Sequence, residues 1–330
     1  MSKILLVTGG YGFIGSHFII HALKAGYKVV NLDKVTYAAS EYVIRSFKNL
    51  PGLTNIVGNI NDEDLCRSIF KKFSPSGLIN FAAETHVDNS IKSAASFIDT
   101  NISGSHNLLK VSEEHYREKN EKFRFLQVST DEVFGSLGKN GTFDERSKIA
   151  PRNPYSATKA AADHLVYSWY NTYDLPIIIT NASNNFGAHQ NIEKLIPKTI
   201  YSIINNDTIS VYGDGSNVRD WLYVEDHVKS LLLIYERGRI GDRYCVGGGK
   251  ELSNIRLIEM LCQIVDKKIG KSPSSLSLIK FVPDRLGHDF RYAIDDKKFV
   301  QEFGKVSNIS FEEKIADTVI WYVNHFSESL

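Results

Sequence analysis

Short apolar runs alternate with amphipathic stretches along the first half of the chain. The runs lack the apolar–polar alternation of a half-exposed strand, which is typical of parallel strands that are buried on both faces. They lie at residues 4–8, 29–33, 78–83, 125–128 and 177–180. Helical patterns separate them, at residues 13–25, 61–72, 101–115 and from 155 past 169. Strands that alternate with helices predict an α/β fold with a doubly wound parallel sheet, the Rossmann arrangement.

The pattern changes after residue 180. Short β-like pieces at residues 209–212, 244–246 and 278–281 are separated by helices and by turns rich in glycine and aspartate. A chain of 330 residues is long enough for a large domain and a smaller one. We therefore expect a Rossmann domain at residues 1–180 and a smaller α/β domain at residues 181–330, with segments that return to the first domain.

Charge and cysteine content argue against several classes of function. The 39 lysines and arginines nearly balance the 38 aspartates and glutamates, without a basic or acidic block, so we expect neither nucleic acid nor a membrane as partner. The apolar N-terminal run is too short for a signal peptide or a membrane span. The three cysteines, Cys66, Cys245 and Cys262, lie far apart and form no metal-binding motif. They are typical of reduced thiols in a cytoplasmic protein, and we expect no metal site.

The first predicted strand runs directly into a glycine-rich loop, Gly9-Gly10-Tyr11-Gly12-Phe13-Ile14-Gly15, which opens a helix. Glycines let a pyrophosphate approach the backbone, and a helix start offers unpaired N–H groups to its negative charge. A glycine pattern alone is weak evidence, but here strand, glycines, helix, second strand and a terminal acid, Asp33, fall in the order of a dinucleotide site. Asp33 would accept hydrogen bonds from an unphosphorylated ribose and repel a 2′-phosphate, which favours NAD over NADP.

Four ionisable side chains are expected to meet where the strand at residues 125–128 ends. Asp131 and Glu132 follow this strand, while Tyr155 and Lys159 are four residues apart at the start of a helix and hence on one face. An adjacent ammonium and a cationic nicotinamide both favour the phenolate, which would make Tyr155 a base for an alcohol proton. Without a cofactor beside it, the same spacing would be an ordinary surface pair of tyrosine and lysine.

The carboxyl pair has a purely structural interpretation as well, because Ser129-Thr130-Asp131-Glu132 has the spacing of a capping box. Successive side chains of a strand point to opposite faces, so the two carboxyls share a cleft only if the chain turns there. A capping box would supply that turn. Hydride transfer needs only Tyr155 and Lys159, and two further carboxyls suggest a second proton transfer, such as an elimination.

The glycine spacing and a series of longer motifs resemble the extended short-chain dehydrogenase/reductases, and among them the nucleotide-sugar 4,6-dehydratases. The motifs run nearly end to end, at residues 82–88, 129–134, 155–159, 183–187, 193–197, 211–215, 218–221 and 284–289. The resemblance implies NAD as cofactor and a nucleotide sugar as substrate. It is closest to enzymes acting on dTDP-glucose, with UDP-glucose as the alternative.

The resemblance also implies a mechanism. Tyr155, assisted by Lys159 and Thr130, would deprotonate the sugar 4-hydroxyl while hydride leaves C4 for NAD. Glu132 would then remove the C5 proton, and Asp131 would protonate the departing 6-hydroxyl. Return of the hydride to C6 would give a 4-keto-6-deoxy sugar, as in the biosynthesis of rhamnose-type deoxysugars.

Binding residues follow from the same resemblance. The NAD site would comprise Gly9, Gly12, Phe13, Ile14, Gly15, Asp33, Lys34, Thr36, Asn59, Ile60, Phe81, Ala82, Ala83, Thr85, Thr100, Tyr155, Lys159 and Asn185. The substrate site would comprise Thr85, Thr130, Asn184, Lys194, Leu195, Val211, Tyr212, Arg219, Asn254, Asp284, Arg285, His288 and Tyr292. Chemistry independently favours Arg219 for the diphosphate, since a guanidinium fork suits phosphate oxygens. A lone arginine is more often a solvated surface charge, and His288 alone would more often be structural.

Some positions depart from the family pattern. Asn59, Asn89 and Cys245 stand where the family usually has aspartate, arginine and asparagine, and Asn191-Ile192 replaces an aromatic–proline pair. These departures leave the preferred nucleotide open.

Two other functions share parts of the same motif set. A UDP-sugar 4-epimerase or decarboxylase would share Tyr155 and Lys159 but would not require the acid at 131 beside the base at 132. A silent NAD-binding regulatory protein would require none of the four ionisable residues. Relatives are usually homodimers, and the helices near residues 101–115 and 156–173 are apolar enough to form a four-helix bundle with a second copy.

Overall fold

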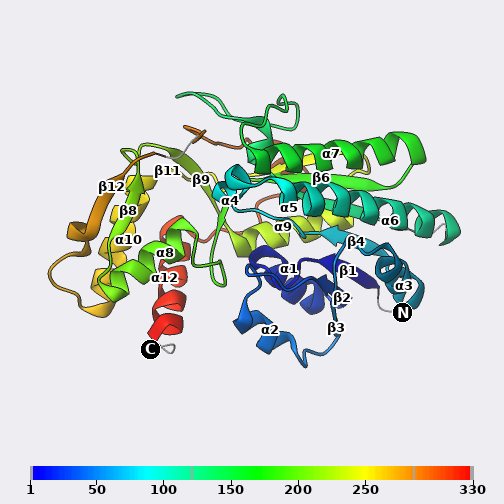
Figure 1. Cartoon of the computed structure of the whole chain (residues 1–330), viewed down its shortest axis with the longest axis horizontal. Helices are drawn as coiled ribbons and strands as arrows, with labels where there is room; N and C mark the ends of the chain where they lie inside the picture. Colours follow the sequence, from blue (N-terminus) through cyan, green and yellow to red (C-terminus); the bar gives the residue numbers. More distant parts are fainter. Residues whose placement is uncertain (1–2, 120–121, 285–286, 328–330) are drawn as a thin grey trace.

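Seven parallel strands form the central sheet of the computed structural model, which describes residues 3–119, 122–284 and 287–327 (Figure 1). Their order is β3-β2-β1-β4-β5-β6-β10. They span Ile4–Thr8 (β1), Lys28–Asp33 (β2), Leu53–Val57 (β3), Gly77–Asn80 (β4), Phe125–Thr130 (β5), Ile177–Ala182 (β6) and Arg243–Val246 (β10). The strand order reverses between β1 and β4, which is where a doubly wound sheet opens a crevice for ligands. The predicted fold class is therefore confirmed.

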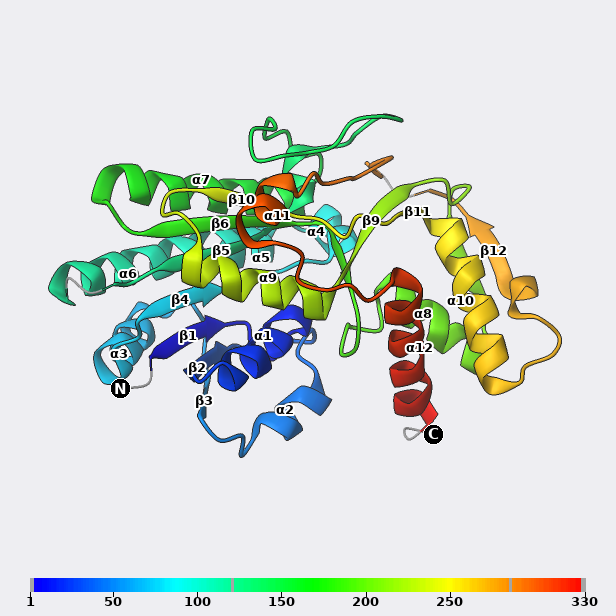
Figure 2. The same ribbon diagram turned by 180° about the vertical axis from the view of Figure 1, so that it is seen from behind.

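Helices cover both faces of this sheet (Figures 1 and 2). Alternate side chains of β1 enter different cores, with Leu5 and Val7 in one and Leu6 in the other. The first core is closed by α1 (Phe13–Lys24), α2 (Glu41–Phe47), α9 (Val224–Arg237) and α11 (Lys297–Phe303), and the second by α3 (Glu63–Phe73), α6 (Ser105–Lys119) and α7 (Pro154–Tyr173). A sheet packed on both sides explains why its strands are continuously apolar.

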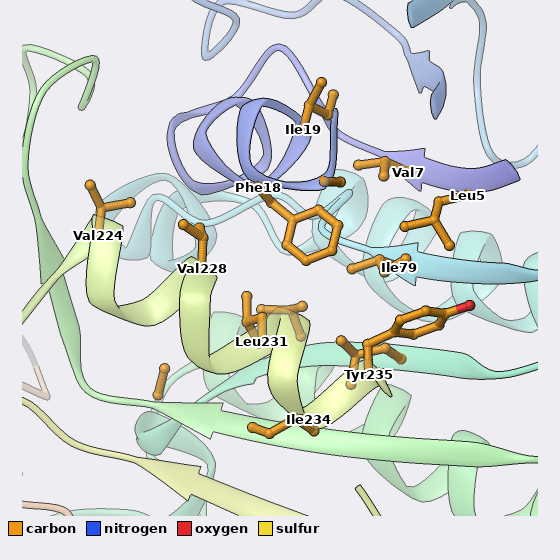
Figure 3. Packing of buried hydrophobic residues seen from close by; sticks show 14 of the residues in the cluster. Leu5, Val7, Phe18, Ile19, Ile79, Val224, Val228, Leu231, Ile234 and Tyr235 are labelled. Carbon is orange, nitrogen blue, oxygen red and sulfur yellow. The ribbon is translucent and has the colours of Figure 1, made fainter. Parts of the chain in front are cut away.

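The first core joins segments that are far apart in the sequence. Phe18 of α1 lies among Val228 and Leu231 of α9 and Ile79 of β4 (Figure 3). The helix α9 follows residue 180 by more than forty positions, yet it packs on the Rossmann sheet. The second half of the chain therefore completes the first half's core.

The placement of residues 244–246 differs from the expectation. They were expected in the smaller domain, but β10 pairs in parallel with β6 and forms the edge of the main sheet, with Tyr244 beside Thr180 and Val246 beside Ala182. A run of three apolar residues carries no signal that distinguishes one sheet from another, and tertiary packing decides.

The smaller part of the molecule lies to one side of the sheet (Figures 1 and 2). Its core is built mainly from α8 (Leu195–Asn205), α10 (Asn254–Ile269) and α12 (Phe311–Ser327), with the parallel pair β8 (Ile209–Tyr212) and β12 (Ile279–Val282). A three-stranded sheet of β7 (Asn184–Phe186), β9 (Val218–Tyr223) and β11 (Glu251–Ser253) lies between the two parts.

Helices form at both of the patterns predicted at residues 61–72 and 101–115. The helix α3 begins after Asp62, whose side chain caps it by accepting a hydrogen bond from Leu65 N (2.9 Å). The helix expected from residue 101 begins as a π-helical segment, Ile98–Gly104, and continues as α6. The remaining elements are α4 (Val87–Lys92), α5 (Ala95–Phe97) and the 3₁₀ turns Asp131–Phe134 and Ser275–Leu278. Within the described residues, no helix is long and apolar enough to cross a membrane.

Candidate active site

A cavity of about 340 Å³ opens at the carboxyl ends of β1, β2, β4 and β5 and reaches the segment that follows β6. All eighteen residues expected to bind the dinucleotide line it, from the glycine loop to Asn185. Four residues expected at the substrate, Thr85, Thr130, Asn184 and Lys194, also line it. Among the described residues, no cluster of His, Cys, Asp or Glu could hold a metal ion.

The glycine loop leaves no space for side chains. Gly9 has a φ of +73°, and a Cβ there would lie 2.8 Å from Ala82 N. A Cβ on Gly15 would lie 2.4 Å from Gly9 O. Gly12, the residue before α1, provides no side-chain cap, so the first amides of this helix remain available to a ligand. Bare backbone beside an uncapped helix start fits a pyrophosphate.

Asp33 ends β2 at the far side of the cavity from Tyr155. Its carboxylate accepts hydrogen bonds from Tyr11 N (2.9 Å) and Val35 N (2.8 Å). Burial raises the pKa of Asp33, while these two amides act in the opposite direction. The backbone thereby holds the acid at the strand end where a ribose is recognised in such folds.

The chain turns directly after β5, at the 3₁₀ segment Asp131–Phe134. The capping residue is Thr130 rather than the expected Ser129, because the Thr130 hydroxyl accepts the bond from Glu132 N (3.3 Å). Thr130 Oγ1 also donates to Asp131 Oδ1 (3.2 Å). The turn lets neighbouring residues 131 and 132 line the same cavity.

Tyr155 and Lys159 come to the cavity from the first turns of α7. This helix begins with a capping box in which Asn153 accepts from Ser156 N (2.8 Å). Tyr155 N donates to Ser90 Oγ (3.2 Å), and Lys159 Nζ donates to Val128 O (2.8 Å). Both side chains are almost completely buried, so α7 and β5 hold them in defined positions.

Electrostatics around Tyr155 oppose the expected phenolate. Burial and then the carboxylates of Glu132 and Asp131 raise the pKa of Tyr155, while a hydrogen bond with Thr130 lowers it. Burial also lowers the pKa of Lys159, against the attraction of Asp163. The protein alone thus favours the neutral phenol, and a cation bound beside the ring would be needed to lower its pKa.

The two carboxyls differ in their surroundings. Burial raises the pKa of Asp131 well above its usual range, and the charges of Glu132 and Asp220 add to the effect. Burial also raises the pKa of Glu132, but Arg219 and a hydrogen bond from Asn153 oppose this. A carboxyl kept protonated beside one that is helped to ionise is the arrangement of an acid and a base.

The other residues expected at the substrate do not line this cavity. They are Leu195, Val211, Tyr212, Arg219, Asn254, Asp284, His288 and Tyr292, and Arg285 lies outside the described residues. Arg219 donates to Val218 O (2.8 Å) and Asp289 O (3.0 Å), and its guanidinium lies 4.6 Å from the centre of the Tyr292 ring. His288 Nδ1 lies 2.7 Å from Asp284 Oδ1.

Arg219 and Tyr292 lie close enough to the carboxyls for their charges to interact. Arg219 acts on the pKa of both Asp131 and Glu132, and Glu132 acts on the pKa of Tyr292. The positive charge of Arg219 therefore lies near the turn that carries Asp131 and Glu132, and its Nη1 and Nη2 donate to carbonyls.

Sequence reasoning missed several residues of the cavity wall, including Glu84, Ser183, Gln190, Glu193 and His227. Glu84, Ser183 and Glu193 lay within recognised motifs and could have been found there. His227 had no such signal. It comes from α9, its Nδ1 lies 2.9 Å from Asn185 Oδ1, and burial lowers its pKa to about 3.

The fold and site define the class of protein as an extended short-chain dehydrogenase/reductase with two adjacent carboxyls in its dinucleotide cavity. The family model for GDP-mannose 4,6 dehydratase matches residues 6–318. The chain belongs to this nucleotide-sugar dehydratase family.

Several individual relatives and solved structures that the chain is similar to are dTDP-glucose 4,6-dehydratases. A dTDP-glucose 4,6-dehydratase of Haemophilus influenzae is 42% identical over 98% of this chain and 99% of its own length. The solved dTDP-glucose 4,6-dehydratase DesIV of Streptomyces venezuelae, with NAD and TYD bound, is 36% identical with a TM-score of 0.91, over 99% of this chain and 98% of that one. The NAD complex of the Bacillus anthracis dTDP-glucose 4,6-dehydratase has the same identity and coverage and a TM-score of 0.88.

The raised pKa of Asp131 predicts a cost in stability. The folded protein retains a proton that the unfolded chain releases above about pH 4, so this carboxyl destabilises the fold increasingly as pH rises towards its folded pKa. Asp131→Asn should therefore be more stable than the parent at pH 8, with a smaller difference at pH 4.5. Urea unfolding at both pH values measures this.

Asp214→Asn is the matched control, because Asp214 is exposed and a hydrogen bond from Ser216 lowers its pKa. It should give no gain at pH 8. An Asp131→Asn protein that is no more stable at pH 8 than the parent would show that this carboxyl is ionised in the fold.

Proposed function

We propose that this protein is an NAD-dependent dTDP-glucose 4,6-dehydratase, a hydro-lyase that converts dTDP-glucose to dTDP-4-keto-6-deoxyglucose for deoxysugar biosynthesis of the rhamnose type. One observation carries the proposal. Asp131 and Glu132 share a single turn and line the same cavity as Tyr155 and Lys159. Their different electrostatic surroundings suit an acid and a base for loss of water.

The residues of the cavity fit NAD. The glycine loop and the start of α1 would hold its pyrophosphate, and Asp33 its adenosine ribose. Lys159 and Tyr155 would lie beside its nicotinamide. When bound, NAD supplies an acceptor for the hydride from C4 of the sugar and a donor for its return to C6. Its positive charge would also bring the pKa of Tyr155 towards neutrality.

The chain's own residues perform the proton transfers. Tyr155 takes the proton of the 4-hydroxyl, with Thr130 bonded to the same oxygen. The ketone formed at C4 acidifies the C5 hydrogen, which Glu132 removes. Asp131 gives its proton to the 6-hydroxyl, which leaves as water.

Glu132 then returns a proton to C5, and the proton held by Tyr155 replaces the one lost by Asp131 through solvent. The net change is the loss of one water molecule.

The carboxyl pair also distinguishes a 4,6-dehydratase from the alternative of a UDP-sugar 4-epimerase. A UDP-sugar 4-epimerase needs Tyr155 and Lys159 but has no step for a protonated acid beside a base. UDP-glucose as the substrate would keep the chemistry and change only the nucleoside, and the dTDP-glucose enzymes among the relatives favour dTDP. Arg219 is proposed to bind the diphosphate after exchanging its carbonyl partners, with Lys194 at the cavity wall.

Asp131→Asn combined with Glu132→Gln should separate the two halves of the reaction. Oxidation at C4 should persist, because Tyr155 and Lys159 are unchanged. Loss of water should fall by about 10²–10⁴-fold for each acid–base group removed. Mass spectrometry of the sugar nucleotide and absorbance of reduced nicotinamide measure the two steps.

The matched control is Asp62→Asn with Glu63→Gln, an adjacent carboxyl pair at the start of α3 that does not line the cavity. It should turn over at the parent's rate. Parent-like loss of water in the active-site double variant would contradict the assigned roles.

We further propose that the protein is a cytoplasmic homodimer joined through α6 and α7. Ile98, in the π-helical segment before α6, is 49% exposed, and Tyr173, at the end of α7, is 39% exposed. The ring of Trp169 lies between Tyr173 and His106 of α6. This outer surface is apolar enough for the same helices of a second copy to cover it. The buried free thiols of the three cysteines suit a reducing compartment.

Sedimentation velocity at micromolar concentration should give a particle of twice the 37.2 kDa chain. Ile98→Glu should shift it towards the monomer, because the interface would bury an unpaired charge. Val57→Glu, at a still more exposed apolar position on the edge strand β3, should remain dimeric. A monomeric parent would refute the dimer.

A further inference from the structure

Arg243 is a buried cation behind the catalytic turn. It is the first residue of β10 and only 7% exposed. Its Nη1 lies 3.3 Å from Asp163 Oδ2, and the same nitrogen donates to Asn181 Oδ1. Asp163 is 1% exposed and Asn181 is fully buried, so the three side chains form a polar cluster closed off from solvent.

The cluster is connected to both ends of the turn that carries the carboxyls. Asn181 Nδ2 donates to Thr130 O (2.8 Å), at the residue that caps the turn. The guanidinium also lies 5.7 Å from the centre of the ring of Phe134, the last residue of the turn. Asp131 and Glu132 lie between these two attachments.

The same cluster is connected to α7. Asp163 follows Lys159 by four residues and Tyr155 by eight, which places all three on one face of the helix. The guanidinium lies 5.5 Å from the centre of the Tyr167 ring, one further turn along α7. Arg243 therefore contacts the helix that carries Tyr155 and Lys159 as well as the turn that carries Asp131 and Glu132.

We propose that Arg243, paired with Asp163, is a positioning residue. It fixes the turn that carries Asp131 and Glu132 relative to α7, so that these carboxyls and the Tyr155 phenol reach the same sugar ring. The inference rests on the proposed dehydratase function. A guanidinium suits this task because its donors have a rigid planar arrangement. It touches neither cavity nor substrate, since Arg243, Asn181 and Asp163 are absent from the cavity wall.

Asp163 interacts with two cations, Arg243 and Lys159. Asp163 attracts the Lys159 ammonium, and Arg243 is the first of the cations that act on Asp163. Without the guanidinium, Lys159 would be the remaining cation for a buried carboxylate. Lys159 would then be drawn from Val128 O and from the position it needs beside Tyr155.

The test uses holoenzyme with NAD and dTDP-glucose, and the variant Arg243→Gln with Asp163→Asn. This pair removes one positive and one negative charge together, so the net charge of the buried cluster does not change. Lengthening a catalytic distance by about 1 Å can cost a factor of about 100, so we expect loss of water to slow by about 10- to 100-fold. Oxidation at C4 should change less than about 3-fold, because α7 and the nucleotide loop remain. Reduced nicotinamide should therefore accumulate during a single turnover.

Arg124→Gln is the control, because Arg124 precedes the opposite end of β5 and donates to Tyr235 O (2.7 Å) and Gly238 O (3.1 Å). It should lower the melting temperature without changing the ratio of the two rates. An unchanged ratio in the Arg243 variant would overturn the inference. If the double variant does not fold, Arg243→Lys is measured in the same way. An unchanged ratio of water loss to C4 oxidation in that variant would also overturn the inference. A parent enzyme that forms no 4-keto-6-deoxy product would instead refute the proposed function.

Discussion

Desolvation of Asp131, Glu132 and Tyr155 at the end of β5 is the electrostatic constraint on which the rest of the structure depends. Asp131 and Tyr155 are buried and Glu132 is half-buried, and desolvation raises the pKa of each. Water stabilises their charges only weakly, so the neighbouring protein groups and the bound ligands determine which of them is ionised. Arg219 and Asn153 favour ionisation of Glu132, whereas Asp131 faces two further carboxylates. A site that needs one neutral and one ionised carboxyl obtains both from this difference.

The fold places these groups by bringing the ends of parallel strands together. The glycine loop follows β1, Asp33 ends β2 and the turn that carries Asp131 and Glu132 follows β5, so all three meet at one edge of the sheet. The second half of the chain then supports this edge from behind. The helix α9 closes the core under α1, and β10 places Arg243 against the turn. The second half of the chain thus supports the turn that carries Asp131 and Glu132.

Motifs with a mechanism allowed most of the cavity to be predicted. The glycine loop, Asp33, the carboxyl pair and the tyrosine–lysine pair each carry a local signal, and their order along the chain places them at strand ends. Signals that depend on tertiary packing were missed. Cys245 was noticed only as a departure from a pattern, while the importance of its neighbour Arg243 depends on Asp163, eighty residues earlier.

Other errors have the same origin. Both Ser129 and Thr130 could cap the turn, and only the backbone geometry decides between them. Tyr155 was expected to be a phenolate beside Lys159 and a cationic nicotinamide, whereas burial and the proximity of Glu132, which raise its pKa in the protein alone, are properties of the folded chain. Arg219 was recognised by its chemistry, but its bonds to the carbonyls of Val218 and Asp289 could not be inferred from residue type.

The most direct measurement follows one hydrogen atom through the reaction. The parent holoenzyme is incubated with dTDP-glucose that carries deuterium at C4, mixed with unlabelled substrate, and the position of the label in the product is read by NMR and mass spectrometry. If a single site takes up the hydride, loses water through Asp131 and Glu132 and returns the hydride, deuterium appears at C6 of the same molecule. Deuterium lost to solvent, retained at C4 or transferred between molecules would contradict the central claim.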